Sequence, residues 1–134
     1  MSGRARTRMS KRNVPLVYGA ANLGNLNRSL TDGQARDILD AAWASGIRHF
    51  DTAPHYGLGL SERRVGAFLR TKNRDDYVVS TKVGRLLRAN PDDDGSLDLD
   101  NGFHVRTDLR REWDFSAEGI TASLDESLVR LGLD

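Results

Sequence analysis

Residues 47–69 read IRHFDTAPHYGLGLSERRVGAFL, and this stretch decides the predicted fold. Its first residues are typical of a short buried strand, which runs into Asp51. A loop with several glycines follows, and Ser61 stands where the N-cap of a helix is expected. The helix is expected to bury three apolar residues on one face: Val65, Phe68 and Leu69. The stretch therefore predicts one strand–loop–helix unit.

Two further segments repeat this plan. Upstream, residues 14–18 are typical of a strand, and Thr31 begins a helix in which Gln34 has the spacing of a capping box. Downstream, residues 77–83 are rich in β-branched residues and predict a third strand, and a last helix begins near Ser116. These helices are expected to bury Ala35, Ile38, Leu39, Ala42 and Trp43 in the first, and Ile120, Leu124, Leu128 and Leu131 in the last.

Alternating strands and helices predict an α/β protein with a parallel sheet covered by helices. A barrel needs about eight strands, whereas a doubly wound sheet can be built from fewer. A doubly wound sheet normally carries a glycine-rich phosphate turn after its first strand, and residues 19–24, GAANLG, lack that fingerprint. We therefore expect residues 14–134 to be an incomplete barrel domain, the N-terminal part (about three βα units) of a (β/α)8 TIM barrel.

Two parts of the chain fall outside this pattern. Residues 1–13 are basic, lack the apolar stretch of a secretory signal, and are expected to form a disordered tail. Residues 84–115 show no periodic signal and predict a long loop over the mouth of the barrel, either a substrate cover or a variable insertion. Near its end, Trp113 and Phe115 would form either an apolar substrate wall or a plug.

The composition argues against several classes of protein. The 134 residues include 20 basic and 19 acidic side chains, and a net charge of +1 gives no reason to expect a nucleic-acid partner. The sequence has no cysteine, which excludes disulfides and thiolate chemistry. No apolar run has the length of a membrane span, and the three histidines lack metal-ligand spacing. We expect a cytoplasmic protein without a metal site or a membrane partner.

Three residues that could perform chemistry lie at or just after strand ends, where barrel enzymes keep their catalytic groups: Asp51, Tyr56 and Lys82. A tyrosine is a weak acid at neutral pH, and a nearby lysine ammonium favours its phenolate form. A buried lysine needs a counter-charge, which Asp51 can supply. The three together could move a proton at a carbonyl or hydroxyl oxygen. Each also has a structural interpretation, as a turn former, a solvent-reaching lysine and a loop-packing tyrosine.

The local sequence resembles one family. Residues 50–57, FDTAPHYG, with the Ser61–Glu62 pair behind them, are similar to the signature of the aldo-keto reductases. Residues 80–85, STKVGR, and residues 127–132, SLVRLG, resemble two later segments of the same family, in the same order. The APHYG and TKVGR versions are most similar to the branch that holds aldose 1-dehydrogenases and pyridoxal dehydrogenases.

The resemblance implies a nicotinamide cofactor, NADP or NAD, and a small carbonyl or sugar substrate. Hydride transfer would interconvert an aldose or small alcohol and its carbonyl or lactone form. The resemblance assigns proton transfer to Tyr56, the tuning of this tyrosine to Lys82, and the holding of that lysine to Asp51. Contacts with the nicotinamide ribose are expected from four residues: Gly19, Ala20, Ala21 and Asp51.

Part of the implied site is expected outside this sequence. The family's fourth catalytic residue is a histidine after its fourth strand, and its phosphate-binding loops follow its last strands; the sequence reaches Asp134 before either. We therefore expect the isolated chain to be inactive. The alternative is a non-catalytic truncated barrel fragment or a piece that only binds a partner. A metal-dependent hydrolase on the same barrel is disfavoured, because Asp51 is the one candidate ligand at a strand end.

Overall fold

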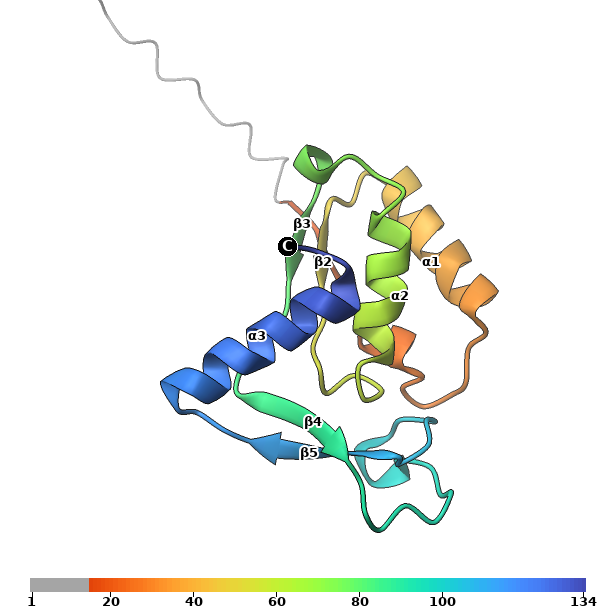
Figure 1. Cartoon of the computed structure of the whole chain (residues 1–134). Coiled ribbons are helices and arrows are strands. Elements are labelled where there is room, and N and C mark those ends of the chain that lie inside the picture. Colours follow the sequence, from red (N-terminus) through yellow and green to blue (C-terminus); the bar gives the residue numbers. More distant parts are fainter. Residues whose placement is uncertain (1–14) are drawn as a thin grey trace, which may run out of the picture.

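The computed structural model describes residues 15–134, which form a parallel sheet, three α-helices and an antiparallel hairpin (Figure 1). The predicted tail at residues 1–13 lies outside the described residues. The sheet has the order β1 (Val17–Gly19), β2 (His49–Asp51) and β3 (Val78–Ser80), all parallel. This is the arrangement predicted for the first three units of a (β/α)8 barrel.

The register of the sheet aligns the carboxyl ends of its strands. Gly19 lies beside Asp51, which lies beside Ser80. The strands are shorter than the sequence pattern predicted, and the third ends at Ser80, after which two side chains bond to neighbouring elements. Thr81 bonds to the helix layer, and Lys82 bonds back to Asp51. Strand ends that meet at one edge can bring distant residues into one site.

The helices α1 (Asp32–Ala44) and α2 (Leu60–Leu69) lie on one side of the sheet, as Figure 1 shows. The Thr31 capping box is confirmed, because its hydroxyl accepts from the Gln34 amide and the Gln34 side chain accepts from the Thr31 amide. The core between helices and sheet contains a cluster of aromatic rings: Trp43, Phe50 and Phe68.

The prediction that Ser61 caps the second helix is wrong. The N-cap is Gly59, whose φ of 86° lets the chain enter α2 without a capping side chain. Ser61 lies inside the first turn and is fully buried. Its hydroxyl donates to the carbonyl of Ala20 at 2.7 Å and lies 2.8 Å from the hydroxyl of Thr52. The side chain therefore joins α2 to the loops that follow β1 and β2.

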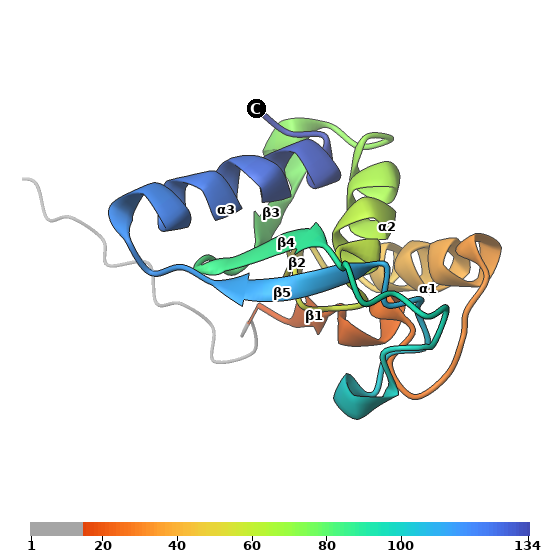
Figure 2. The same ribbon diagram turned by 60° about the horizontal axis from the view of Figure 1, so that its bottom comes forward.

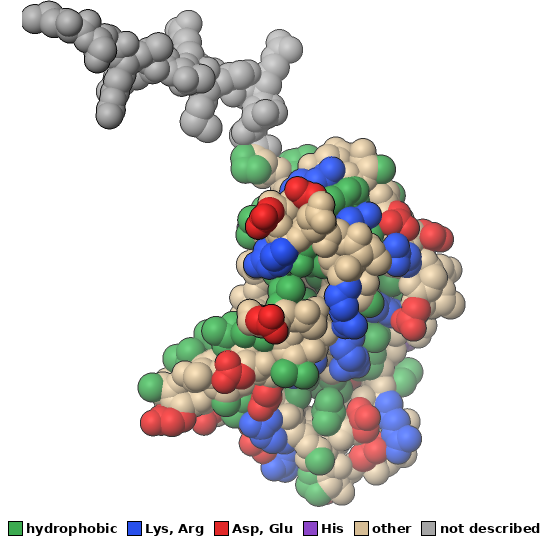
Figure 3. Space-filling view, turned by 45° about the horizontal axis from the view of Figure 1, so that its top comes forward, with side chains coloured by type: hydrophobic (Ala, Val, Ile, Leu, Met, Phe, Trp, Pro, Cys, Tyr) green, Lys and Arg blue, Asp and Glu red, His purple; other side chains and the backbone are tan. Residues whose placement is uncertain are grey.

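Helix α3 (Ala117–Leu131) begins after Ser116 and buries Leu131 as predicted, but the rest of its buried face differs from the prediction. Ile120 and Leu124 remain 38% and 42% exposed, and the residues that turn inward are Gly119, Ser123, Ser127 and Leu131. Small side chains let the helix backbones approach closely: a methyl group on Gly66 of α2 would overlap the backbone of Leu131. Figure 3 shows hydrophobic side chains exposed among acidic and basic ones on the face it presents.

Residues 84–115, predicted to be a loop, contain the hairpin of β4 (Arg85–Ala89) and β5 (Leu109–Trp113). Sequence periodicity did not reveal the strands because the adjacent residues Leu86 and Leu87 are both buried, which breaks the alternation of a half-exposed strand. Figures 1 and 2 show the hairpin across the carboxyl ends of the parallel strands. No helix within residues 15–134 is long and apolar enough to cross a membrane.

One buried carboxylate connects the three units. Glu62 of α2 is 0% exposed, accepts a hydrogen bond from the hydroxyl of Thr81 at 2.6 Å, and pairs with the guanidinium of Arg130 on α3. A buried ion pair adds little net stability, but removal of one partner leaves an uncompensated charge. The Glu62 carboxylate therefore holds both α3 and Thr81, the residue just before Lys82, against the first turn of α2.

We expect Arg130→Met to lower the free energy of unfolding of the chain by about 3–5 kcal/mol, because Glu62 would stay buried without its counter-charge. Urea unfolding followed by circular dichroism measures the change. Arg110→Met is the matched control, since Arg110 forms an exposed pair with Glu112 that is worth about 1 kcal/mol or less. Equal losses in the two variants would contradict the role assigned to the buried pair.

Candidate active site

The three predicted catalytic residues come together at the carboxyl edge of the sheet. The ammonium of Lys82 donates to Oδ2 of Asp51 and to the carbonyl of Thr52, both at 2.9 Å. The same nitrogen lies 5.0 Å from the centre of the Tyr56 ring. The lysine is thus held between a carboxylate and an aromatic ring that come from β2 and the loop after it.

The second oxygen of Asp51 is also held. Ser80 donates its hydroxyl proton to Oδ1 at 2.7 Å, and Nε2 of His49 lies 2.9 Å from the Ser80 oxygen. Because the one hydroxyl proton of Ser80 points at the carboxylate, His49 must be the donor, which places its proton on Nε2. The sequence analysis missed both residues. The period of two along β2 and β3 could have found them, since His49 and Ser80 share a sheet face with Asp51.

The pKa values of the pair diverge. Partial burial acts to raise the pKa of Asp51, but hydrogen bonds from Lys82 and Ser80 and the lysine charge outweigh it, and the pKa is lowered. Burial likewise acts to lower the pKa of Lys82, but Asp51 and Tyr56 outweigh it, and this pKa is raised. Both shifts favour the charged forms, so the carboxylate and the ammonium persist together at neutral pH.

The loop that carries Tyr56 is packed from two sides. Gly57, with a φ of 65°, lies in close contact with Gly24. A methyl group on Gly57 would overlap the backbone of Gly24, and one on Gly24 would overlap the backbone of Tyr56 and Gly57. On the other side, the ring of Phe103 from the hairpin loop lies 6.3 Å from the Tyr56 ring and 5.2 Å from the His55 ring, centre to centre. The fold thus restrains the Tyr56 backbone before any ligand binds.

A buried ion pair anchors the hairpin to this loop. The guanidinium of Arg111 pairs with Asp98 at 2.6 Å and donates to the carbonyl of His55 at 2.9 Å. The side chains of Arg111 and Asp98 are only 13% and 6% exposed. The segment predicted to be either a substrate cover or a variable insertion is therefore bonded directly to the loop that carries Tyr56.

The four predicted cofactor residues lie along the same edge. Ala20 is fully buried, its amide donates to the Asp51 carbonyl at 2.8 Å, and its carbonyl accepts from Ser61. Its backbone is therefore committed within the protein. Gly19 is exposed, and a Cβ there would meet no atom within 4 Å. Ala21, two residues further on, is half-buried. The accessible part of this edge is therefore the Gly19 backbone, which lies beside Asp51 on the neighbouring strand.

A cavity of about 220 Å³ lies next to the lysine and is lined by Ala53, Pro54, His55, Lys82, Val83, Arg85 and Trp113. Trp113, predicted as a wall or a plug, lines this cavity, and Phe115 stacks on it at 5.3 Å.

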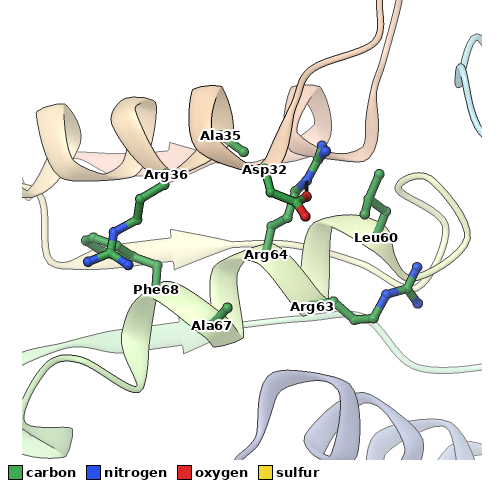
Figure 4. A pocket seen from close by; sticks show the side chains of 8 residues that line it. All are labelled: Asp32, Ala35, Arg36, Leu60, Arg63, Arg64, Ala67 and Phe68. Atoms are coloured by element: carbon green, nitrogen blue, oxygen red, sulfur yellow. Dashed lines mark hydrogen bonds and ion pairs between the residues drawn. The ribbon is translucent and has the colours of Figure 1, made fainter.

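A larger hollow of about 400 Å³ lies between α1 and α2, where Figure 4 shows Arg64 reaching toward Asp32 and Arg36 beside Phe68. None of the predicted site residues lines that hollow.

A parallel βα sheet with a lysine–aspartate pair and a tyrosine at its carboxyl edge defines a βα-barrel protein with its polar site over the strand ends. Within the described residues, no group of three or more histidine, aspartate or glutamate side chains could hold a metal ion. The model of the aldo/keto reductase family matches residues 15–134. The chain belongs to this family.

Similar proteins include two bacterial dehydrogenases. The D-threo-aldose 1-dehydrogenase of a Pseudomonas species is 67% identical over 89% of this chain and 36% of its own length. The pyridoxal 4-dehydrogenase of Microbacterium luteolum is 41% identical over 87% of this chain and 36% of its own length. The chain thus spans about a third of the length of these relatives.

Solved structures confirm the fold. The holo form of an aldo-keto reductase from Bacillus halodurans superposes with a TM-score of 0.64 at 30% identity, over 90% of this chain and 33% of that one. The glycerol dehydrogenase of Gluconobacter oxydans gives a TM-score of 0.61 at 27% identity, over 87% and 32%. The described residues are therefore the N-terminal part of a (β/α)8 barrel, as predicted.

The imidazole of His55 gives a direct test of the electrostatics of this site. Burial, followed by the charges of Arg111 and Arg85, lowers the pKa of His55 from 6.5 to about 4, against a smaller opposing effect of Asp98. We expect its NMR titration to have a midpoint near 4. Since the unfolded chain binds this proton first, stability should fall as the pH drops from 6.5 toward 4, and His55→Gln should flatten that slope. A midpoint near 6.5 would contradict the described environment.

Proposed function

We propose that the protein is an NAD(P)-dependent oxidoreductase that interconverts an aldose or small alcohol and its carbonyl or lactone form. One observation carries the proposal: the Lys82 ammonium lies between the Asp51 carboxylate and the Tyr56 ring at the carboxyl edge of the barrel sheet. The dehydrogenases that the chain resembles support the reaction type and favour a sugar-like or pyridoxal-like substrate. We place the enzyme in the cytoplasm.

Each residue of the site has one proposed role. Tyr56 takes the hydroxyl proton when an alcohol is oxidised and returns a proton to the oxygen when a carbonyl is reduced. Lys82 holds its positive charge 5.0 Å from the centre of the ring, where it stabilises negative charge that develops during proton transfer. Asp51, held in turn by Ser80, keeps the ammonium charged and in place.

A bound nicotinamide would supply the hydride acceptor or donor at the substrate carbon. The residues present fit this group, because the edge beside Asp51 is open at Gly19, where a Cβ would meet nothing within 4 Å. Gly19 and Ala21 would border it, while Ala20 shapes the edge through its buried methyl group. The cofactor would be NADP or NAD.

Tyr56→Phe should lower turnover by about 100-fold or more, since it removes the proton-transferring oxygen, and leave the nucleotide affinity within about threefold. Because the chain spans about a third of its relatives, residues 15–134 are grafted in place of the matching segment of the Pseudomonas dehydrogenase. Stopped-flow absorbance at the reduced nicotinamide band measures turnover, and fluorescence titration measures nucleotide binding.

Tyr77→Phe is the matched control for this variant. Tyr77 is buried just before β3, at the end of the strand opposite to Lys82, so its phenol lies outside the proposed chemistry. The control should retain the turnover of the unmodified graft. Retained turnover in Tyr56→Phe, or an equal loss in both variants, would contradict the assignment.

A further inference from the structure

Two residues that line the cavity beside Lys82 carry a polar atom that the protein leaves unpaired. Nδ1 of His55 and Nε of Arg85 are buried and have no hydrogen-bond partner among the described residues. Both residues line the cavity of about 220 Å³. Buried polar atoms without partners cost free energy and are uncommon in folded proteins. A ligand with oxygen atoms in the cavity would lie beside these two polar side chains and offer them hydrogen-bond partners, whereas a hydrocarbon ligand would not.

The guanidinium of Arg85 is fixed before a ligand arrives. Arg85 of β4 lies directly opposite Trp113 of β5, and its Cζ is 3.8 Å from the centre of the indole ring. Phe115 stacks on the same indole at 5.3 Å and an interplanar angle of 24°, and packs against Gly84. Planar stacking of arginine on an aromatic face leaves its in-plane N–H groups available to acceptors.

The charges around the cavity favour an electron-rich ligand. Asp51 pairs with Lys82, and Asp98 pairs with Arg111. Among residues 15–134, Arg85 forms no ion pair with a carboxylate. The cavity wall therefore carries one uncompensated positive charge. His55 adds a neutral imidazole at physiological pH, because burial and the neighbouring arginines lower its pKa to about 4.

We propose that Arg85, with His55, forms a subsite that selects substrates bearing acceptor oxygens, hydroxyl or carboxylate, on the carbons next to the reacting carbon. Lys82 and Arg85 both line the cavity, so a substrate whose reacting carbon lies at the Lys82 side would extend along the wall that carries the guanidinium. This inference rests on the proposed function for the identity of the reacting carbon. The binding preference itself is a property of the cavity and can be measured without turnover.

The test is an NMR titration of the 134-residue chain, read at the indole N–H of Trp113 and the imidazole of His55. The probes are sodium glycerate, glycerol and 1-propanol, which share a three-carbon backbone. We expect saturable shifts with glycerate or glycerol and none with 1-propanol. A response to glycerol shows that hydroxyls suffice, and a response to glycerate alone identifies the carboxylate as the group that is bound. Equal responses to all three probes, or none to any, would overturn the proposal.

Arg85→Gln should weaken binding of the responsive probe by about tenfold or more, because a hydrogen bond to a charged group is lost. Arg85→Lys, which keeps the charge but lacks the planar fork, should fall between this variant and the unmodified chain. Arg110→Gln is the matched control on β5, where Arg110 pairs with Glu112, and should bind normally. Unchanged binding in Arg85→Gln, or an equal loss in Arg110→Gln, would overturn the assignment to Arg85.

A parallel assay separates this inference from the proposed function. In the grafted enzyme, the KM for glyceraldehyde should rise about tenfold in Arg85→Gln, while the KM for propanal stays within about twofold. An inactive graft that still shows the probe preference would sink the oxidoreductase proposal and leave the subsite. If the graft is active and the ratio of the two KM values is the same with and without Arg85→Gln, the subsite proposal is contradicted and the oxidoreductase proposal stands.

Discussion

The buried carboxylate of Glu62 is the constraint on which the remaining structure depends. It lies in the first turn of α2 and bonds to two other elements. It accepts a hydrogen bond from Thr81, just after β3, and forms an ion pair with Arg130, near the end of α3. Its neighbour Ser61 bonds the loop after β1 through the Ala20 carbonyl. Two consecutive side chains thus tie the first, second and third units to one helix turn. The strand ends that carry the polar site are therefore set relative to one another by the helix layer.

The site divides its charges between two tasks. Asp51 and Lys82 neutralise each other, and their shifted pKa values keep both ionised, so the pair is a stable internal support for the tyrosine beside it. Across the cavity, Arg85 has no such partner among the described residues and is held by stacking alone. The charge of Lys82 is thus compensated by a neighbouring carboxylate, whereas that of Arg85 is not compensated by any described residue.

Local chemistry made some elements predictable and tertiary packing hid others. The Thr31 capping box follows from two residues three positions apart and was found from sequence. The parallel strands and the convergence of Asp51 and Lys82 follow from alternating units whose strand ends meet. The capping role given to Ser61 was wrong because a glycine two positions earlier already starts the helix. The predicted burial of Leu131 on α3 is confirmed, but small residues face inward where Ile120 and Leu124 were expected, because the helix backbones approach closely.

The hairpin begins and ends at nearly the same point, because the Asp114 amide donates to the Gly84 carbonyl at 3.0 Å and Gly84 is in turn bound by the Ser123 hydroxyl. An insertion whose ends are already joined adds little loop-closure entropy to the barrel when its length changes. The whole segment can therefore change in length or sequence at little entropic cost to the barrel, while the lysine and the carboxylate beneath it stay in place.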